Sequence, residues 1–245
     1  MVEMGNSNLY QPSGMSREEF LPQLRGQRAS AVYREMTEND PTVGSVLFAV
    51  EMLLRRVEWN VEPGGEEPAD IDAADFVATC VEDMSHSWPD FISDVLTMLP
   101  FGYAFSEIVY KRRSGPANAD PTGRSRYTDG KIGWRKFMLI PQDTIPHFDF
   151  DEHGGIQGIT QQAGGALVTI PIEKGLLFRT QTRRPMGRSV LRNAYLPWYQ
   201  KKRIEEVEGI GIERDLAGLP VLYLDPSLMA DPTRKAEYEK IDRRC

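Results

Sequence analysis

"SVLRNAYLPWYQKKRIEEVEGIGIERDLAG" (residues 189–218) is a single stretch with helical spacing and few apolar residues. It predicts a helix that begins near Ser189 and continues to Leu216, with Gly218 as a favourable residue just past its end. At 1.5 Å per residue such a helix is about 40 Å long, well above the usual length in globular proteins. Because charged residues cover most of its surface, it cannot bury much within its own chain. We expect it to pack beside another helix, such as a copy of itself.

The apolar stripe of this helix changes direction along its length. Ile204 follows Trp198 by six residues, which rotates it by about 240° at helical pitch. Pro197 lies where the stripe turns, so the sequence predicts either a kink there or two halves that pack on different neighbours. The residues expected to pack between subunits are Leu191, Tyr195, Trp198, Ile204, Val207 and Ile210.

An earlier stretch, "REMTENDPTVGSVLFAVEMLLRRVEWNVEP" (residues 34–63), contains no catalytic side chain. Asp40 and Pro41 are typical of a helix start, and apolar residues recur at helical spacing from Val43 to Val57, which predicts a core helix. Val57, Trp59 and Val61 then alternate with polar residues and predict a strand leaving that helix.

Further helices and strands follow in separate blocks. Amphipathic stretches at 71–84 and 91–99 predict two more helices, and aromatic and β-branched segments predict strands from about residue 101 to 180, including a hairpin that turns at Gly154-Gly155. Residues 113–130 are rich in turn formers and form either a long exposed hairpin connection or a flexible flap. Helices followed by mostly antiparallel strands indicate the α+β class.

Composition limits the possible functions. The 245 residues carry a net charge of −7, so bulk attraction to nucleic acid or to an anionic membrane is not expected. The apolar runs are far shorter than the roughly 20 residues that span a bilayer, and no signal peptide is recognisable. The two cysteines allow no disulfide framework and no metal quartet, and fit a reducing compartment such as the cytoplasm.

Motifs for catalysis are not found. His86, His147 and His153 lie in three different contexts without metal-ligand spacing. "FDFDE" (residues 148–152) superficially resembles a Ca²⁺ or Mg²⁺ cluster, but strand alternation predicts that Asp149 and Asp151 form a solvated face opposite two buried phenylalanines. The chain is therefore not expected to be an enzyme, and we expect no cofactor and no metal.

Short basic runs are the candidate contacts to DNA phosphates. Runs of this kind are usually solvated, and acidic neighbours weaken them, so the predicted contact is local and independent of base sequence. The candidates are Arg183, Arg184, Arg188, Lys201, Lys202 and Arg203.

Four segments, taken in order, resemble one known family. They are "YREMTENDPTVGSVLFAVEMLLRRVEWNVEP", "LPFGYAFSEIVYKRR", "IGWRKFMLIPQDTIPHFDFDEHGGIQGITQ" and "GRSVLRNAYLPWYQKKRIEEVEGIGIERDLAGLPVLYLDP". Together they resemble the portal proteins of tailed bacteriophages, particularly the Mu-like group, over about residues 33–226. Members of that family are generally longer, so the resemblance implies that this chain corresponds to the N-terminal half, with the clip truncated.

The resemblance implies a structural subunit of a homo-oligomeric ring, commonly of twelve copies, at the portal vertex of the virion capsid. Double-stranded DNA passes through such a head-tail connector during packaging and ejection. Terminase, the major capsid protein and head-completion or adaptor proteins contact it, assembly takes place in the host cytoplasm, and no membrane is involved. The implied parts are an N-terminal arm (1–40), an α+β wing (41–187), a stem helix (188–217) and the start of a clip (218–245).

Two other function classes stay open on the sequence. An adaptor or scaffold module of a virion would share the α+β wing but bind one partner in a fixed small stoichiometry. A metal-dependent nucleic-acid-processing enzyme would need clustered carboxylates such as Asp149 and Asp151 to hold divalent cations.

Overall fold

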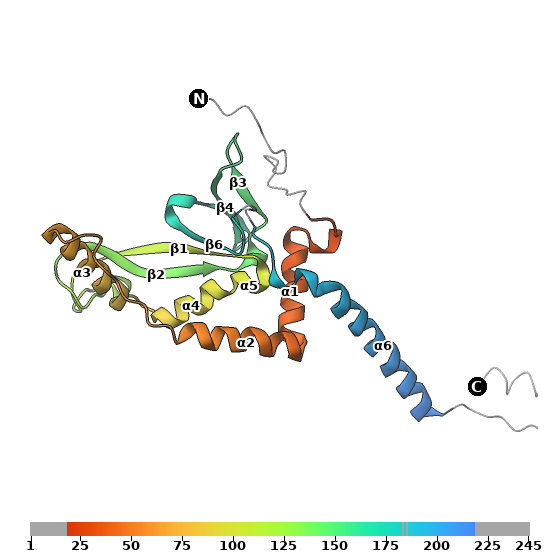
Figure 1. The fold of residues 1–245 in the computed structure, drawn as a ribbon. Helices are drawn as coiled ribbons and strands as arrows, with labels where there is room; N and C mark the ends of the chain where they lie inside the picture. The colour runs from red at the N-terminus through yellow and green to blue at the C-terminus, as the bar shows by residue number, and fades with distance from the viewer. Residues whose placement is uncertain (1–18, 183, 185, 219–245) are drawn as a thin grey trace, which may run out of the picture. The chain divides into compact units, whose positions relative to one another are not determined.

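The computed structural model describes residues 19–182, 184 and 186–218. The chain divides into two units, Met1–Ala194 and Tyr195–Cys245. In the first unit, helices are followed by two three-stranded antiparallel sheets (Figure 1), which confirms the predicted α+β class. The described part of the second unit contains the long helix α6 (Tyr195–Ala217).

Among the helices of the first unit, α2 (Pro41–Arg55) begins where the sequence predicts, whereas α1 (Gly26–Asn39) was not predicted and lies within the segment expected to be an N-terminal arm (1–40). A short 3-10 helix η1 (Pro22–Leu24) leads into α1, and Asp40 then separates α1 from α2. The Asp40 carboxylate accepts hydrogen bonds from the N–H groups of Thr42 and Val43, at 2.9 and 3.1 Å. This cap satisfies two of the backbone donors that a helix start leaves without an internal partner.

The prediction that α2 is a core helix is wrong. None of its side chains is buried, and Val46, Phe48 and Leu53 are each about 60 % exposed or more. The apolar spacing is helical as expected, but α1 and α4 cover only part of the circumference of α2. Spacing shows which side of a helix is apolar, whereas burial depends on whether another element lies against that side.

The strand predicted for residues 57–61 is also absent. After α2 ends, residues 57–63 belong to neither sheet, and Trp59 is 60 % exposed. The next helices, α3 (Pro68–Glu82) and α4 (Trp88–Leu96), lie close to the predicted ranges, whereas the short α5 (Met98–Phe101) was not predicted.

Two sheets contain the predicted β segments. In the first, β1 (Tyr103–Arg112) lies between β2 (Ile132–Ile140) and β6 (Gly175–Arg179). In the second, β4 (Ile156–Ala163) lies between β3 (His147–Phe150) and β5 (Ala166–Pro171). Short 3-10 helices occur at Pro121–Gly123 (η2), Gln142–Thr144 (η3), Ile172–Lys174 (η4) and Val190–Asn193 (η5).

The core joins the two sheets through large side chains. Phe105 on β1 and Phe148 on β3 are fully buried, and the Tyr103 ring meets Phe148 edge-on with centroids 5.0 Å apart. The whole cluster contains Tyr103, Phe105, Ile140, Ile145, Phe148, Ile159 and Ile170. A second aromatic group attaches α4 to the first sheet, since Phe91 lies 4.8 Å from Phe137 and 6.0 Å from Phe178 between ring centroids.

Two glycines bring the segment after β6 against the start of β1. Gly102 and Gly187 are buried, both have positive φ, and a Cβ on Gly187 would overlap the carbonyl oxygen of Gly102. Thr180 ties the same place together, because its backbone N–H donates to the Gly102 carbonyl at 3.0 Å and its hydroxyl accepts from the Arg188 N–H at 2.8 Å. The chain therefore needs glycine here both for its backbone angle and for space.

Gly187→Ala tests this contact. We expect it to lower the free energy of unfolding by more than about 3 kcal/mol, since left-handed backbone strain of about 1–2 kcal/mol adds to the steric overlap. Gly164→Ala is the matched control, because Gly164 has nearly the same φ (56° against 55°) but no atom within 4 Å of the place that a Cβ would occupy. Urea denaturation measures both. Equal losses for the two variants would show that the close approach of Gly187 to Gly102 does not matter.

Candidate functional site

The long helix α6 is the first candidate, and it begins later than the sequence predicts. The Ser189 hydroxyl accepts from the Leu191 N–H at 3.0 Å and starts the 3-10 helix η5, and α6 follows from Tyr195. Pro197 is thus in the first turn of α6, where a missing N–H breaks no helical hydrogen bond. The irregularity expected at Pro197 lies instead before Tyr195.

Along α6 the apolar side chains are exposed. Ile204 and Ile210 are each 58 % exposed and Val207 is 70 % exposed. The other exposed apolar residues of the helix are Leu196, Tyr199, Ile212 and Leu216. Burying one such side chain is worth about 1.5–3 kcal/mol, so α6 leaves a large stabilisation unused within the described residues.

The other three residues that were predicted to pack between subunits, Leu191, Tyr195 and Trp198, do not all belong to α6. Leu191 is buried, but it belongs to η5 in the first unit and not to α6. Tyr195 and Trp198 are in the first turn of α6, with ring centroids 6.2 Å apart.

The predicted DNA contacts on α6 have acidic neighbours. The Lys201 ammonium lies 3.8 Å from the Glu205 carboxylate, and the Arg203 guanidinium lies 3.5 Å from Glu206. The Lys202 ammonium lies 5.6 Å from the centroid of the Trp198 ring. Such exposed pairs contribute only tenths of a kcal/mol, so the three cations can exchange partners at little cost.

The remaining predicted cations belong to the first unit, apart from Arg183, which lies outside the described residues. Arg184 and Arg188 both line a cavity of about 980 Å³ at the start of α1. The cavity lining contains five arginines and one glutamate, in a chain whose net charge is −7. The structure thus gathers Arg184 and Arg188 into a cationic hollow that the sequence did not reveal.

Arg192 is the best-anchored arginine of this cavity, and sequence analysis missed it. Its Nε and Nη2 each donate to the Glu19 carboxylate at 2.7 Å, across 173 positions of sequence. Burial opposes ionisation of Glu19, but Arg192 and the Leu21 N–H outweigh it and hold the pKa of that carboxyl below its usual value. The pair fixes the segment before α1 against η5.

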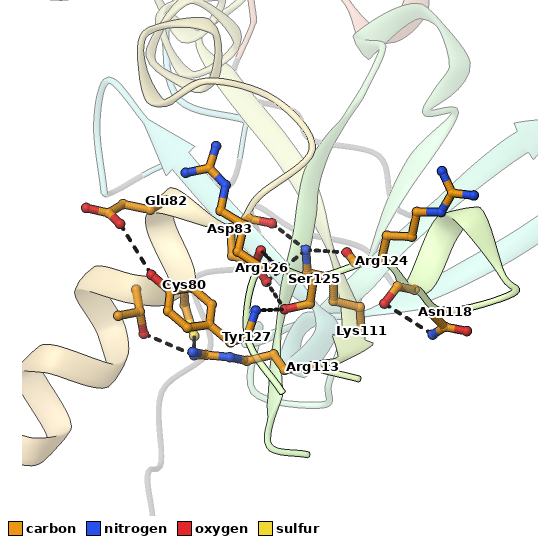
Figure 2. A network of polar contacts seen from close by, with 12 residues as sticks. Cys80, Glu82, Asp83, Lys111, Arg113, Asn118, Arg124, Ser125, Arg126 and Tyr127 are labelled. Atoms are coloured by element: carbon orange, nitrogen blue, oxygen red, sulfur yellow. Dashed lines mark hydrogen bonds and ion pairs between the residues drawn. The ribbon is translucent and has the colours of Figure 1, made fainter. Parts of the chain in front are cut away.

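A polar network anchors the β1–β2 connection (Figure 2). The Lys111 ammonium on β1 donates to the Asp83 carboxylate and to the Arg124 carbonyl, each at 3.0 Å, and also to the Asp83 carbonyl. The side chains of Lys111 and Asp83 are about 5 % exposed. Three acceptors occupy the three ammonium donors, so this lysine is a structural cation and not a general base.

Asp83 also binds the later part of the β1–β2 connection, around Ser125. It accepts from the Ser125 hydroxyl at 2.6 Å and from the Arg126 N–H at 2.8 Å. Burial opposes ionisation of Asp83, but these donors together with Lys111 keep its pKa below the usual value. The sequence predicted either a hairpin connection or a flexible flap for residues 113–130. The structure supports the hairpin connection, which is fixed at Ser125.

Arg113 contacts both the β1–β2 connection and α3. Its guanidinium lies 3.2 Å from the Asp129 carboxylate and 4.0 Å from the centroid of the Tyr127 ring (Figure 2 labels both Arg113 and Tyr127). It also donates to the Thr79 hydroxyl of α3 at 3.0 Å. This arginine belongs to a basic run in the sequence, and its burial shows that it stabilises the fold instead of facing a partner.

The acidic stretch after β2 shows no metal geometry. Asp149 on β3 accepts from the Thr160 hydroxyl at 3.0 Å, whereas Asp151 lies in the following turn and accepts from the Gly155 N–H at 2.6 Å. The expected shared strand face is therefore wrong for Asp151. Among the described residues no group of three His, Cys, Asp or Glu side chains could hold a metal ion, and no helix is long and apolar enough to cross a membrane.

Asp83→Asn tests the buried pair. It leaves the Lys111 ammonium buried without its counter-charge, which costs about 3–5 kcal/mol of unfolding free energy. Because the pKa of Asp83 is lower in the folded state, its contribution is present above about pH 4 and is lost as the pH falls further. Denaturation curves at pH 7 and pH 3 measure both effects, and the two proteins should differ less at pH 3.

Asp120→Asn is the control, because Asp120 caps η2 in the same connection but is exposed, and asparagine caps a helix about as well. If Asp83→Asn lowers the free energy of unfolding at pH 7 no more than Asp120→Asn does, then Asp83 and Lys111 do not stabilise the fold as a buried pair.

The comparisons with known proteins agree with this architecture. A family model described as the portal protein of Mu bacteriophage matches residues 30–241. A solved structure titled "Virion of native gene transfer agent (GTA) particle" is similar in fold, with a TM-score of 0.53 and 10% sequence identity. The similarity covers 86% of this chain and 52% of that chain, so this chain spans about half its length. Because the family match extends over most of the sequence, the chain belongs to the portal protein family of Mu bacteriophage.

Proposed function

We propose that this chain is a structural subunit of a portal ring at a capsid vertex, through which DNA is packaged and ejected. The observation that carries the proposal is the row of exposed apolar side chains on α6. Because the chain belongs to the portal family, we expect this helix to have a structural role and not an enzymatic one. In this proposal residues 41–187 are the wing, the helix within 188–217 is the stem beside the channel, and residues 1–40 are an arm.

A ring would supply the apolar contacts that α6 does not make with the described residues. In a cyclic assembly each subunit meets two neighbours through different surfaces, so one exposed helix can be covered on both sides without any further protein. Ile204, Val207 and Ile210 then become buried between copies. We propose twelve copies, with terminase, the major capsid protein and head-completion proteins docking on the ring, and the region after residue 218 beginning the clip.

Charge supports a conduit and not a DNA-holding clamp. A protein that neutralises many phosphates releases counterions and binds DNA tightly, which would oppose sliding. This chain has a net charge of −7, and its candidate channel cations Lys201 and Arg203 are paired with glutamates on the same helix. Contacts to DNA would therefore be few, weak and restricted to the backbone. The ring would form in the host cytoplasm and remain in the virion.

Paired substitutions on α6 test assembly. Ile204→Glu with Val207→Glu places two charges in the proposed interface, and we expect the ring to be replaced by monomers, because an unpaired charge is costly to bury. Glu208→Gln, on the same helix, should leave the ring intact. Light scattering after size-exclusion chromatography and negative-stain images measure the subunit number. A wild-type protein of fixed small stoichiometry would instead support an adaptor module.

A second substitution set tests the channel contacts. Changing Lys201, Lys202 and Arg203 to Gln should leave assembly unchanged and make DNA binding by the ring less dependent on salt. Each phosphate contact that is lost lowers the slope of log affinity against log salt by about one.

Changing Arg112, Arg124 and Arg126 to Gln is the matched control for charge, since these are three exposed cations at or beside the β1–β2 connection. An equal change of slope in the control would show that net charge, and not the α6 cations, sets the salt dependence.

A further inference from the structure

Residues 58–62 have the sequence of a strand, but they pair with no strand in the described part of the chain. Val57, Trp59 and Val61 alternate with Glu58, Asn60 and Glu62. Among the described residues, no hydrogen bond reaches the backbone of positions 58–62, and the last backbone contact before them is the Val57 N–H to the Leu54 carbonyl at 3.2 Å. Five consecutive peptide groups are thus available to another chain.

The apolar side of this segment is exposed as well. Trp59 is 60 % exposed, although its ring lies 6.3 Å from that of Trp88, and Val57 and Val61 are 47 % and 40 % exposed. β-Branched and aromatic residues of this kind favour strands because they pack on the surface of a sheet. Neither of the two sheets formed by the described residues includes this segment.

The same chain has a sheet edge that could accept a strand. Among the described strands β5 is an edge strand that pairs with β4 alone, and its residues Leu167 and Val168 are 67 % and 46 % exposed. Its sequence, ALVTIP, contains no charge, and its one proline is the last residue. Edge strands usually carry charges or central prolines that block pairing with another chain, and β5 has neither.

We propose that residues 58–62 of one copy add to the edge of β5 in a neighbouring copy as an antiparallel strand. This inference rests on the ring proposed above and names one of its subunit contacts. The two surfaces differ, so each copy donates at one side and accepts at the other. A heterologous contact of this kind leads to a closed ring or a filament and not to a simple dimer.

The faces of the two strands set the register. Ile170 on β5 is buried in the core and Val168 is on the same face, two residues away. The apolar side of the added strand matches this face when Trp59 lies opposite Ile170 and Val61 opposite Val168. A shift of one residue would turn Trp59 to the outer face.

Charge and length agree with a second copy as the partner. Five residues of donor span about 17 Å, as does most of the six-residue β5. Antiparallel pairing brings Glu58 to the Pro171 end of β5, which continues into η4 with Lys174, whereas β5 itself presents no acid to repel Glu58 or Glu62.

The area that a stable interface buries indicates that the five-residue strand does not form the whole contact. A stable interface buries about 1,200–2,000 Å² in total, more than one five-residue strand provides. The exposed face of α2 directly precedes the segment and carries Val46 and Leu53, which are 59 % and 68 % exposed. The strand and α2 therefore form one continuous docking surface for the neighbouring copy.

Cysteine crosslinking tests the register. Asn60→Cys with Thr169→Cys places two thiols directly opposite each other on the outer face, where neighbouring Cβ atoms lie about 4.5–5.5 Å apart. Asn60→Cys with Val168→Cys is the matched control, because these side chains point to opposite faces. Both variants carry Cys245→Ser to limit background. Under mild oxidation, we expect a ladder of covalent multimers in a non-reducing gel for the first pair, and crosslinking at least about tenfold slower for the control.

A second experiment tests the backbone hydrogen bonds of the added strand. Asn60→Pro removes an N–H from the middle of the added strand, and we expect the concentration for half-assembly to rise at least about tenfold, while Asn60→Ala keeps the N–H and should not change it. Rings that form normally with Asn60→Pro, or that crosslink equally in both cysteine pairs, contradict the strand addition but not the ring. A wild-type protein that forms no ring contradicts both proposals.

Discussion

Apolar surface that the described part of the chain leaves exposed is the constraint on which the rest of the structure depends. On α6, Ile204, Val207 and Ile210 are more than half exposed, and α2 exposes Val46 and Leu53 to a similar degree. Because burying each such side chain is worth about 1.5–3 kcal/mol, two exposed helices represent a large driving force for association. A soluble monomer gains little from keeping such faces, whereas a subunit of a closed assembly uses them as contacts.

The first unit provides the rigidity that such an assembly needs. Phe105 and Phe148 join the two sheets, Gly102 and Gly187 allow the segment after β6 to pack against the start of β1, and the Lys111–Asp83 pair fixes the β1–β2 connection. Each of these is a packing or positioning device, and none presents a reactive group to a cleft. A rigid body with exposed apolar helices fits a portal subunit, whose proposed work is to hold neighbours in place while DNA passes.

Local patterns were predicted well, and contacts between distant residues were not. Asp40 and Pro41 specify the start of α2 through short-range capping, and helical spacing indicated the existence of α3, α4 and α6. The sequence could not show that α2 is left uncovered, that residues 57–61 lack a sheet, or that Arg192 meets Glu19 across 173 positions, since each depends on how remote segments pack. Of the candidate site residues, Leu191 proved to be apart from α6, while Ile204, Val207 and Ile210 lie together on it.

Hydrogen exchange of α6 in the assembled and the diluted protein tests the central claim most directly. If neighbouring copies cover α6, the backbone amides of residues 204–212 exchange slowly at high concentration and at least about a hundredfold faster on dilution, because most of the stability of a helix in a protein comes from the packing that dilution removes. The amides of β1 should be unaffected by concentration. Exchange at α6 that is equally fast, or equally slow, at all concentrations would contradict the claim that copies of this chain bury one another's helices.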